Sequence, residues 1–432
     1  MSETVKRNLI LYGSSALVLA LAFLVKSPYM GYAIWAFVLL VALANVSSRA
    51  WLSGLDCERT IDRTTLRQGE EAVVSITLTN RRGWPIPWIF IEDFTPSGFP
   101  VMGDKCRLAV LMPGRSLRLN YTLTCPKRGY HRVGPLLMES GDLFGLQKRF
   151  RSGHQQEYVS VLPTVAYIDT FNVAAKRPHG PVRMSNRVYE DPTRFSSLRE
   201  YVRGDPFNRI HWKASARTGE LFVKQCEPAN VMGGTLILDL FEAWYQGEKG
   251  EGRMELAVTT AASIAYLLQM SNEQVGLITN ARDAAEVAKY EVAAKTTLAR
   301  QDMDAALAGE DESDRLNPLT VPTRRGIGQA QQIIENLARV LPTDGLDCGQ
   351  LIMNEFRKLP RDATLIPVLP VVTPDLALIL GQMKVSGFNV TVFLIDNAPK
   401  YEECAGLLAQ HNIYCFHIEH EWQLHEISPA RI

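Results

Sequence analysis

In the C-terminal half of the chain, apolar strand-like segments alternate with segments of helical periodicity, and this alternation constrains the fold most strongly. The first strand-like segment is 236–240, the first helical one is 255–270, and the series continues to 413–417. Strands separated by helices pair in parallel, because the helix carries the chain back before the next strand begins. We therefore predict an α/β doubly wound domain over residues 233–432, with helices on both faces of the sheet. Within it, residues 299–319 are acidic and lack apolar periodicity, which indicates a mobile insertion.

Residues 55–165 have a different sequence pattern, in which short β-prone segments are separated by glycine and proline turns. In residues 72–79, apolar side chains alternate with serine and threonine, which is the pattern of a strand with one buried face. These features predict an antiparallel β-sandwich, immunoglobulin-like in arrangement. Residues 166–232 would then form a connecting region between the two domains.

The N-terminal segment contains two apolar runs, 8–25 and 29–46, separated by a three-residue turn. At about 1.5 Å rise per residue each run reaches roughly 27 Å, close to the thickness of a hydrocarbon core. We predict a transmembrane helical hairpin within residues 1–50, in contact with the lipid bilayer over residues 8–46. A cleaved signal peptide and a buried soluble hairpin are the alternatives.

Charge and cysteine content suggest where such a hairpin would place the rest of the chain. Lys6, Arg7 and Arg49 flank the two runs, whereas the turn between them offers only Lys26, so the positive-inside rule favours both ends in the cytoplasm. The seven cysteines are odd in number and lack a C-x-x-C spacing, which suits a reducing compartment. The sequence thus predicts a multi-pass inner (plasma) membrane protein with its soluble body in the cytoplasm.

The overall charge argues against a nucleic-acid partner. There are 46 acidic and 46 basic residues, so the formal net charge is zero. Proteins that bind nucleic acid gain most of their affinity from clustered cations that neutralise phosphates. We therefore expect no nucleic acid to bind.

The stretch 199–227 places glycine, proline, tryptophan and cations at spacings that packing alone does not require. Asp205 is a favoured helix N-cap, Pro206 suits the first helical position, and Gly219 follows the last periodic residue, where a left-handed cap is expected. The pattern predicts a short helix over residues 206–217, followed by a strand.

On this predicted helix, Arg209, Lys213 and Arg217 recur every four residues and form one cationic stripe. The stripe can pair with acidic residues between the domains, remain solvated, or dock on an acidic partner surface. We expect Trp212 to be a packed anchor and His211 to be structural, since no positioned acid or nucleophile is evident beside it.

This pattern resembles the core motif of a large bacterial family called domain of unknown function 58. The resemblance implies a membrane hairpin, a β-rich region and a von Willebrand factor A-like domain, and it implies partnership with MoxR-type AAA+ ATPases. The matching residues are Arg199, Tyr201, Gly204, Asp205, Arg209, Ile210, Trp212, Lys213, Ala216, Arg217, Gly219, Leu221, Val223, Lys224 and Glu227. The candidate partner-binding residues are Gly204, Asp205, Arg209, His211, Trp212, Lys213, Arg217 and Gly219.

The von Willebrand A-like resemblance also implies a divalent-cation site made of an Asp-x-Ser-x-Ser loop, a threonine and a second aspartate. Asp239 keeps the first aspartate, but Phe241 and Ala243 replace the serines and Thr373 stands where the second aspartate is expected. Thr323 is the candidate threonine. We therefore predict no metal and no cofactor, with Asp239 capping a helix or accepting from loop amides.

These features favour a non-catalytic, membrane-tethered adaptor or scaffold for protein–protein interaction. By resemblance, it would act with a MoxR-type AAA+ ATPase in the maturation or remodelling of protein complexes. One rival is a cysteine- or metal-dependent hydrolase, in which Cys226 and His211 act as nucleophile and base. Another is a structural membrane scaffold that self-associates into a homo-oligomer.

Overall fold

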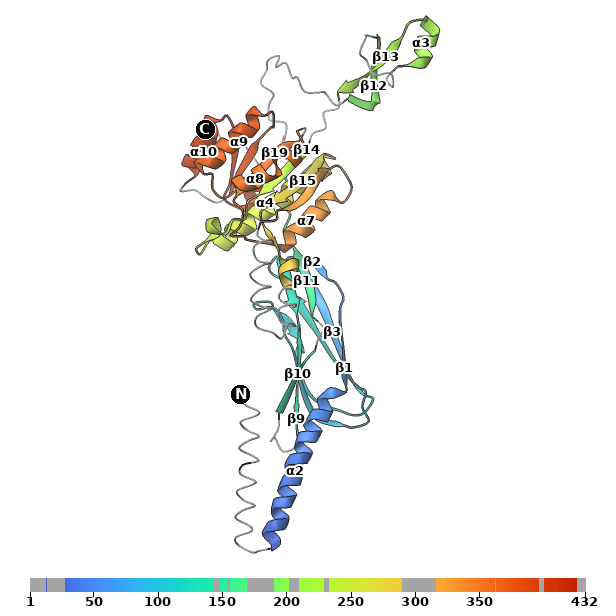
Figure 1. Cartoon of the computed structure of the whole chain (residues 1–432), viewed down its shortest axis with the longest axis vertical. Coiled ribbons are helices and arrows are strands. Elements are labelled where there is room, and N and C mark those ends of the chain that lie inside the picture. Colours follow the sequence, from blue (N-terminus) through green and yellow to red (C-terminus); the bar gives the residue numbers. More distant parts are fainter. Residues whose placement is uncertain are drawn as a thin grey trace. The chain divides into compact units, whose positions relative to one another are not determined.

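A computed structural model describes residue 13 and residues 28–142, 148–153, 156–168, 190–201, 210–228, 233–289, 316–361, 363–395 and 400–425. The chain divides into two compact units, Met1–Leu162 and Pro163–Ile432 (Figure 1). Each unit has its own packed core and is described by itself.

The first unit consists mainly of β-strands. They are β1 (Leu55–Ile61), β2 (Thr65–Arg67), β3 (Glu71–Asn80), β4 (Ile86–Asp93), β5 (Val101–Gly103), β6 (Cys106–Leu111), β7 (Ser116–Thr124), β8 (Gly129–Val133), β9 (Leu136–Gly141), β10 (Lys148–Ser152) and β11 (Glu157–Leu162).

In the described residues these strands form two four-stranded antiparallel sheets and a smaller third sheet. The larger sheets have the orders β1-β3-β7-β5 and β10-β9-β4-β6, and the third has the order β2-β11-β8. Along β3 every second residue from Ala72 to Asn80 is buried. The apolar members of this set, from Ala72 to Leu78, share one core with residues of the facing sheet such as Ile89 and Met138. These pairings form an antiparallel β-sandwich.

The helix α2 (Pro28–Ser53) precedes the sandwich and joins it at its C-terminal end. Leu52 is buried in the sandwich core, and Nη1 of Arg151 donates a hydrogen bond to the Leu52 carbonyl oxygen at 2.6 Å. Thus the last turn of this helix belongs to the sandwich.

The predicted transmembrane hairpin is wrong, and so is the multi-pass membrane localisation. The contact with the lipid bilayer over residues 8–46 stays a prediction. Among the residues that the structure describes, no helix is both long enough and apolar enough to span a bilayer. The prediction relied on the hydropathy of two separate runs. The first run lies outside the described residues apart from Gly13, and the second is only part of a longer helix whose end packs on protein.

A buried polar link joins the two large sheets of the sandwich. Nη2 of Arg59 on β1 pairs with Oδ1 of Asp93 on β4, and the hydroxyl of Tyr121 on β7 donates to Oδ2 of Asp93 at 2.6 Å. Nη1 of Arg59 also donates to the carbonyl oxygen of Val133 at 3.3 Å. Burial, followed by the Asp93 carboxylate, raises the pKa of Tyr121, so its hydroxyl keeps the proton that it donates.

The second unit alternates strands and helices. Its sheet strands are β14 (Gly233–Leu238), β15 (Gln274–Thr279), β17 (Leu319–Arg324), β19 (Thr364–Leu369), β20 (Thr391–Ile395) and β21 (Tyr414–Ile418), with a separate short pair β16 (Arg282–Asp283) and β18 (Val340–Leu341). The described helices that follow β14 include η2 (Glu242–Tyr245), α4 (Gly250–Met270), α7 (Gln329–Arg339), α8 (Cys348–Glu355), η3 (Phe356–Lys358), α9 (Pro374–Val385), α10 (Tyr401–Gln410) and η5 (Glu421–His425).

The sheet of the second unit has the order β17-β15-β14-β19-β20-β21. All neighbours are parallel except β17, which is antiparallel to β15 at the edge. Ile237 of β14 packs in one cluster with Leu351 of α8 and Leu380 of α9. On the opposite face, a Cβ added to Gly234 would lie 2.8 Å from Leu268 of α4. Helices therefore cover both faces, as predicted for a doubly wound sheet. Residues 299–315 of the predicted insertion lie outside the described residues.

The polar link in the sandwich core leads to a stability prediction. We expect Asp93→Ala to destabilise the first unit by about 3–5 kcal/mol, because it leaves the Arg59 charge buried without its partner. The free energy of opening of the β3 amides, measured by native-state hydrogen exchange, tests this.

The matched control is Asp56→Ala, which removes the exposed ion pair between Asp56 and Arg81. We expect a loss below about 1 kcal/mol for this variant. Equal losses in the two variants would contradict a structural role for the buried link.

Candidate functional site

The signature segment forms a small structure of its own within the second unit (Figure 1). The strand β12 (Glu190–Glu200) pairs antiparallel with β13 (Phe222–Pro228). Between them in sequence lies the helix α3 (Trp212–Thr218). An isolated bridge between Ile210 and Val223 brings the chain just before α3 beside β13.

Both ends of α3 are capped. At its start the His211 side chain accepts through Nδ1 from the Ala214 amide at 3.0 Å. At its end Gly219 has φ of 80°, the left-handed conformation that glycine adopts readily, and its amide donates to the Ser215 carbonyl oxygen at 3.0 Å. The hydroxyl of Ser215 accepts from the Phe222 amide at 2.9 Å and so ties α3 to β13.

The prediction of this helix is right at its end and wrong at its start. Gly219 is the C-cap, as expected, but α3 begins at Trp212 with His211 as N-cap. Ile210 is instead paired with β13, because burying its side chain against Val223 competes with continuing the helix. Three predicted site residues, Gly204, Asp205 and Arg209, lie outside the described residues.

Trp212, Lys213 and Arg217 are exposed on α3. The indole of Trp212 is 65% exposed, so the prediction of a packed anchor is wrong. Ile210, only 4% exposed, is buried instead. In the sequence, Trp212 and Ile210 are both apolar, and this alone does not determine which of the two side chains is buried and which is exposed to solvent.

The hydrolase alternative requires Cys226 as nucleophile and His211 as base. Nδ1 of His211 is occupied as the α3 cap. Cys226 lies on β13 with its backbone opposite Phe195, and its side chain is outside the description. The structure therefore gives His211 a structural use and does not bring together a nucleophile and base among the described side chains.

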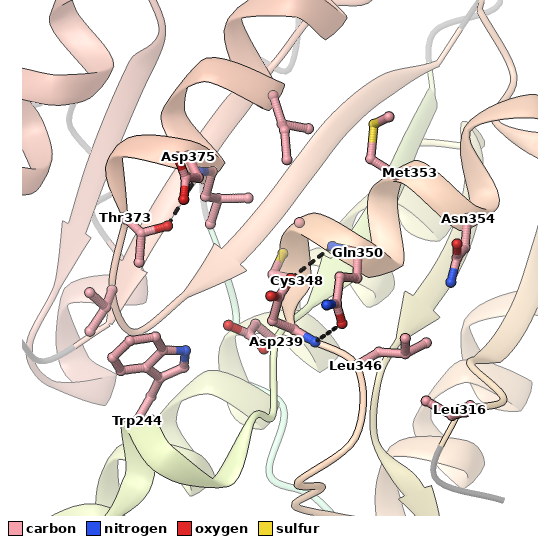
Figure 2. A pocket seen from close by; sticks show the side chains of 15 residues that line it. Asp239, Trp244, Leu316, Leu346, Cys348, Gln350, Met353, Asn354, Thr373 and Asp375 are labelled. Carbon is pink, nitrogen blue, oxygen red and sulfur yellow. Dashed lines mark hydrogen bonds between the residues drawn. The ribbon is translucent and has the colours of Figure 1, made fainter. Parts of the chain in front are cut away.

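A second candidate site lies at the carboxyl end of the parallel sheet, where β14 and β19 are neighbours. The chain runs from β14 to one side of the sheet and from β19 to the other, which is the topological switch point where ligands bind in doubly wound folds. A pocket of about 690 Å³ opens there (Figure 2). Asp239, Trp244, Cys348, Thr373 and Asp375 are among the residues that line it.

Asp239 follows β14 directly and is 1% exposed. Its Oδ1 accepts from Nδ2 of Asn280 at 2.8 Å and from the Phe241 amide at 3.1 Å, which confirms the predicted bond to a loop amide. Burial raises the pKa of Asp239 to about 6, although these two hydrogen bonds oppose the rise. A buried carboxyl with a raised pKa in a cleft is the pattern of a functional site.

The residues around Asp239 do not fit a divalent cation. The hydroxyl of Thr373 accepts from the Leu376 amide at 3.3 Å as the N-cap of α9. Thr323 hydrogen-bonds to Thr235, which lies four residues before Asp239 on β14, or about 13 Å along a strand. Within the described part of the chain, no cluster of three or more His, Cys, Asp or Glu side chains is arranged to hold a metal.

Several pocket residues were not found from the sequence, because folding brings them together from distant loops. Asp347 carried a local signal: it caps α8 by accepting from the Gln350 amide at 2.7 Å, and the Gln350 side chain accepts from the Asp347 amide in return (Figure 2). Trp244 and Asp375 carried none, since only the sheet order places η2 and the start of α9 beside Asp239.

The raised pKa of Asp239 predicts how stability depends on pH. Because the pKa in the folded state, about 6, exceeds the ordinary value of 3.8, the folded state binds the proton more tightly, and stability falls as the pH rises between these values. We expect Asp239→Asn to abolish this loss and to stabilise the second unit at neutral pH by roughly 3 kcal/mol, at about 1.4 kcal/mol per pKa unit. Hydrogen exchange of the β14 amides measures this.

The control is Asp375→Asn, which removes an exposed carboxyl of the same pocket and should keep the wild-type pH dependence. An Asp239→Asn variant with an unchanged pH slope would show that the buried carboxyl does not titrate as described.

The chain resembles known proteins over part of its length. It is 25% identical over 281 residues to the uncharacterized protein YeaD of Bacillus subtilis, which covers 62% of this chain and 68% of the relative. Solved structures match about a quarter of the chain. They include native alpha-2-macroglobulin from Escherichia coli (14% identity, 26% of this chain and 17% of that chain, TM-score 0.22) and a FixG-related protein from Vibrio parahaemolyticus (10% identity, 26% and 98%, TM-score 0.19).

At these TM-scores the solved structures carry no argument about fold or function. The match that bears on the site is the one to a family model described as "Protein of unknown function DUF58", which covers residues 197–298. That range contains the candidate residues from Gly204 to Gly219 and also Asp239. The resemblance stated from the signature segment is confirmed to this extent: the segment that holds α3 and Asp239 matches DUF58, and the chain is a distant homologue of YeaD.

Proposed function

We propose that this chain is a non-catalytic adaptor or scaffold for protein–protein interaction, and that α3 carries the contact. The observation that carries the proposal is the exposure of Trp212 beside the exposed cations Lys213 and Arg217. Tryptophan and arginine are the residues most enriched among those that dominate binding energy at protein interfaces. A tryptophan that contributes nothing to a core gains most from burial against a partner.

The way α3 is held supports this role. Its seven residues are too few to form a stable helix alone, and the His211 and Gly219 caps with the Ser215 bond to β13 compensate for that. A surface that is ordered before binding loses less conformational entropy when the partner docks. The segment therefore presents its tryptophan and cations in a defined arrangement.

The chemistry of this surface indicates an acidic partner. Lys213 and Arg217 lie four residues apart, so both cations reach the same side of the helix. From the family resemblance, we propose that the partner is a MoxR-type AAA+ ATPase and that the pair acts in maturation or remodelling of protein complexes. The sheet order with its antiparallel edge strand β17 supports the further proposal that the second unit is von Willebrand factor A-like. We propose no cofactor.

The test uses crosslinking capture from the source cells and then the dissociation constant for the captured ATPase. We expect Trp212→Ala to weaken binding at least about tenfold, which is the typical effect of a hot-spot truncation. We expect the double variant Lys213→Glu, Arg217→Glu to weaken binding more than Trp212→Ala does. This loss should be larger at low salt than at high salt. The matched control is Trp84→Ala, because Trp84 is 73% exposed in the first unit.

The outcomes separate the proposal from its rivals. Binding that is unchanged in both α3 variants would contradict α3 as the contact. Oligomers of the wild-type chain that persist without any ATPase and ignore the α3 variants would favour the self-associating scaffold. If the wild-type chain shows hydrolase activity and a folded Cys226→Ala variant loses it, the hydrolase alternative would be favoured.

A further inference from the structure

The pocket at the carboxyl end of β14 has charges of one sign. Its lining includes three acidic residues, Asp239, Asp347 and Asp375, and among the described residues that line it there is no lysine, arginine or histidine. Its volume of about 690 Å³ falls in the range of roughly 300–1,000 Å³ that small ligands and inserted side chains occupy. The pocket is thus built to favour a cation over an anion.

The three carboxyl groups differ in exposure. Asp347 and Asp375 are exposed, whereas Asp239 is 1% exposed. Both side-chain hydrogen bonds of Asp239 go to Oδ1, and within the described residues Oδ2 accepts none. Asp239 lines the pocket, so Oδ2 is open to it and can accept a hydrogen bond from a donor that enters there.

The walls narrow the choice of cation. Trp244 is half-buried at the pocket beside Asp239, and Met353, Leu376 and Val371 add apolar surface (Figure 2). A planar guanidinium can lie against an indole face and donate two parallel hydrogen bonds to one carboxylate. An ammonium group is more strongly hydrated and loses more on entering apolar surroundings. A divalent cation does not fit, because the ligands that it needs are missing among the described residues.

We propose that this pocket binds a guanidinium group, presented either by an arginine of a partner protein or by a small free ligand. The Asp239 carboxylate accepts the hydrogen bonds, Trp244 covers one face of the planar cation, and Asp347 and Asp375 attract it to the opening. The proposal rests on residues other than those of α3, so it stands or fails separately from the proposed adaptor contact.

Calorimetric titration of the full chain tests this with matched probes. N-acetyl-arginine amide represents an arginine within a polypeptide, and agmatine represents a free small guanidinium. N-acetyl-citrulline amide is the neutral isostere, and N-acetyl-lysine amide is the ammonium comparison. We expect a guanidinium probe to bind saturably, citrulline to bind at least about tenfold more weakly, and lysine to lie between them.

Three variants locate the binding. Asp239→Asn keeps the shape and the Oδ1 acceptor and should weaken the guanidinium probe at least about tenfold. Trp244→Leu should weaken it several-fold. Glu403→Gln removes an exposed carboxyl of α10 that does not line the pocket, and it should change nothing. Asp375→Asn gives a second test, because it removes an exposed carboxyl of the pocket, and we expect it to weaken binding a few-fold at low salt.

Tighter binding of blocked arginine than of agmatine would assign the pocket to a partner protein, and the reverse order would assign it to a free ligand; both support the proposal. Equal binding of arginine and citrulline probes would overturn it. So would unchanged affinity in Asp239→Asn and Trp244→Leu, or no saturable binding of either guanidinium probe.

Discussion

The arrangement of the second unit depends on the position of β14 in the middle of its sheet. With β15 on one side and β19 on the other, and with α4 and α8 on opposite faces, every residue of this strand is buried. At the carboxyl end of the sheet, the chain after β14 leads toward β15 on one side, and the chain after β19 leads toward β20 on the other side. The pocket lies between these loops, and Asp239, the residue directly after β14, lines it. The order of the strands therefore sets the position of the pocket, and the side chains that line it set its chemistry.

Local periodicity was sufficient to predict much of this framework. The strand predicted at 72–79 is β3 (Glu71–Asn80), and the helix predicted at 255–270 is α4 (Gly250–Met270), because both have one pattern repeated over several residues. The pairing of distant segments is not encoded in such patterns. Asp239 was singled out because the von Willebrand A-like resemblance implies an aspartate after the first strand, whereas no local pattern pointed to Trp244 or Asp375 as its neighbours in the pocket.

The errors arise where one local signal competes with packing. Hydropathy treated the two N-terminal runs as a pair of spans, although the helix α2 continues to Ser53 and buries Leu52 in the sandwich. In the signature segment, Asp205 and Pro206 suit a helix start, yet the chain at Ile210 pairs with β13 and the helix begins after it. The same change moves the buried apolar position from Trp212 to Ile210. Helix boundaries depend on which side chain finds a core, and a single sequence leaves that choice open.

The two candidate sites are held in different ways, and the contrast bears on why Asp239 is present. On α3, the caps and the Ser215 bond stabilise the helix that presents the exposed side chains, so stability and the presentation of these side chains do not conflict. At the pocket they conflict: an ionised carboxylate at 1% exposure is unfavourable, and no cation among the described residues that line the pocket offsets it. An asparagine would keep the hydrogen bond from Phe241 without the charge. A residue that lowers the stability of its own unit at neutral pH is best explained by what it binds, and a cation that arrives from outside the fold is the partner that would offset its burial.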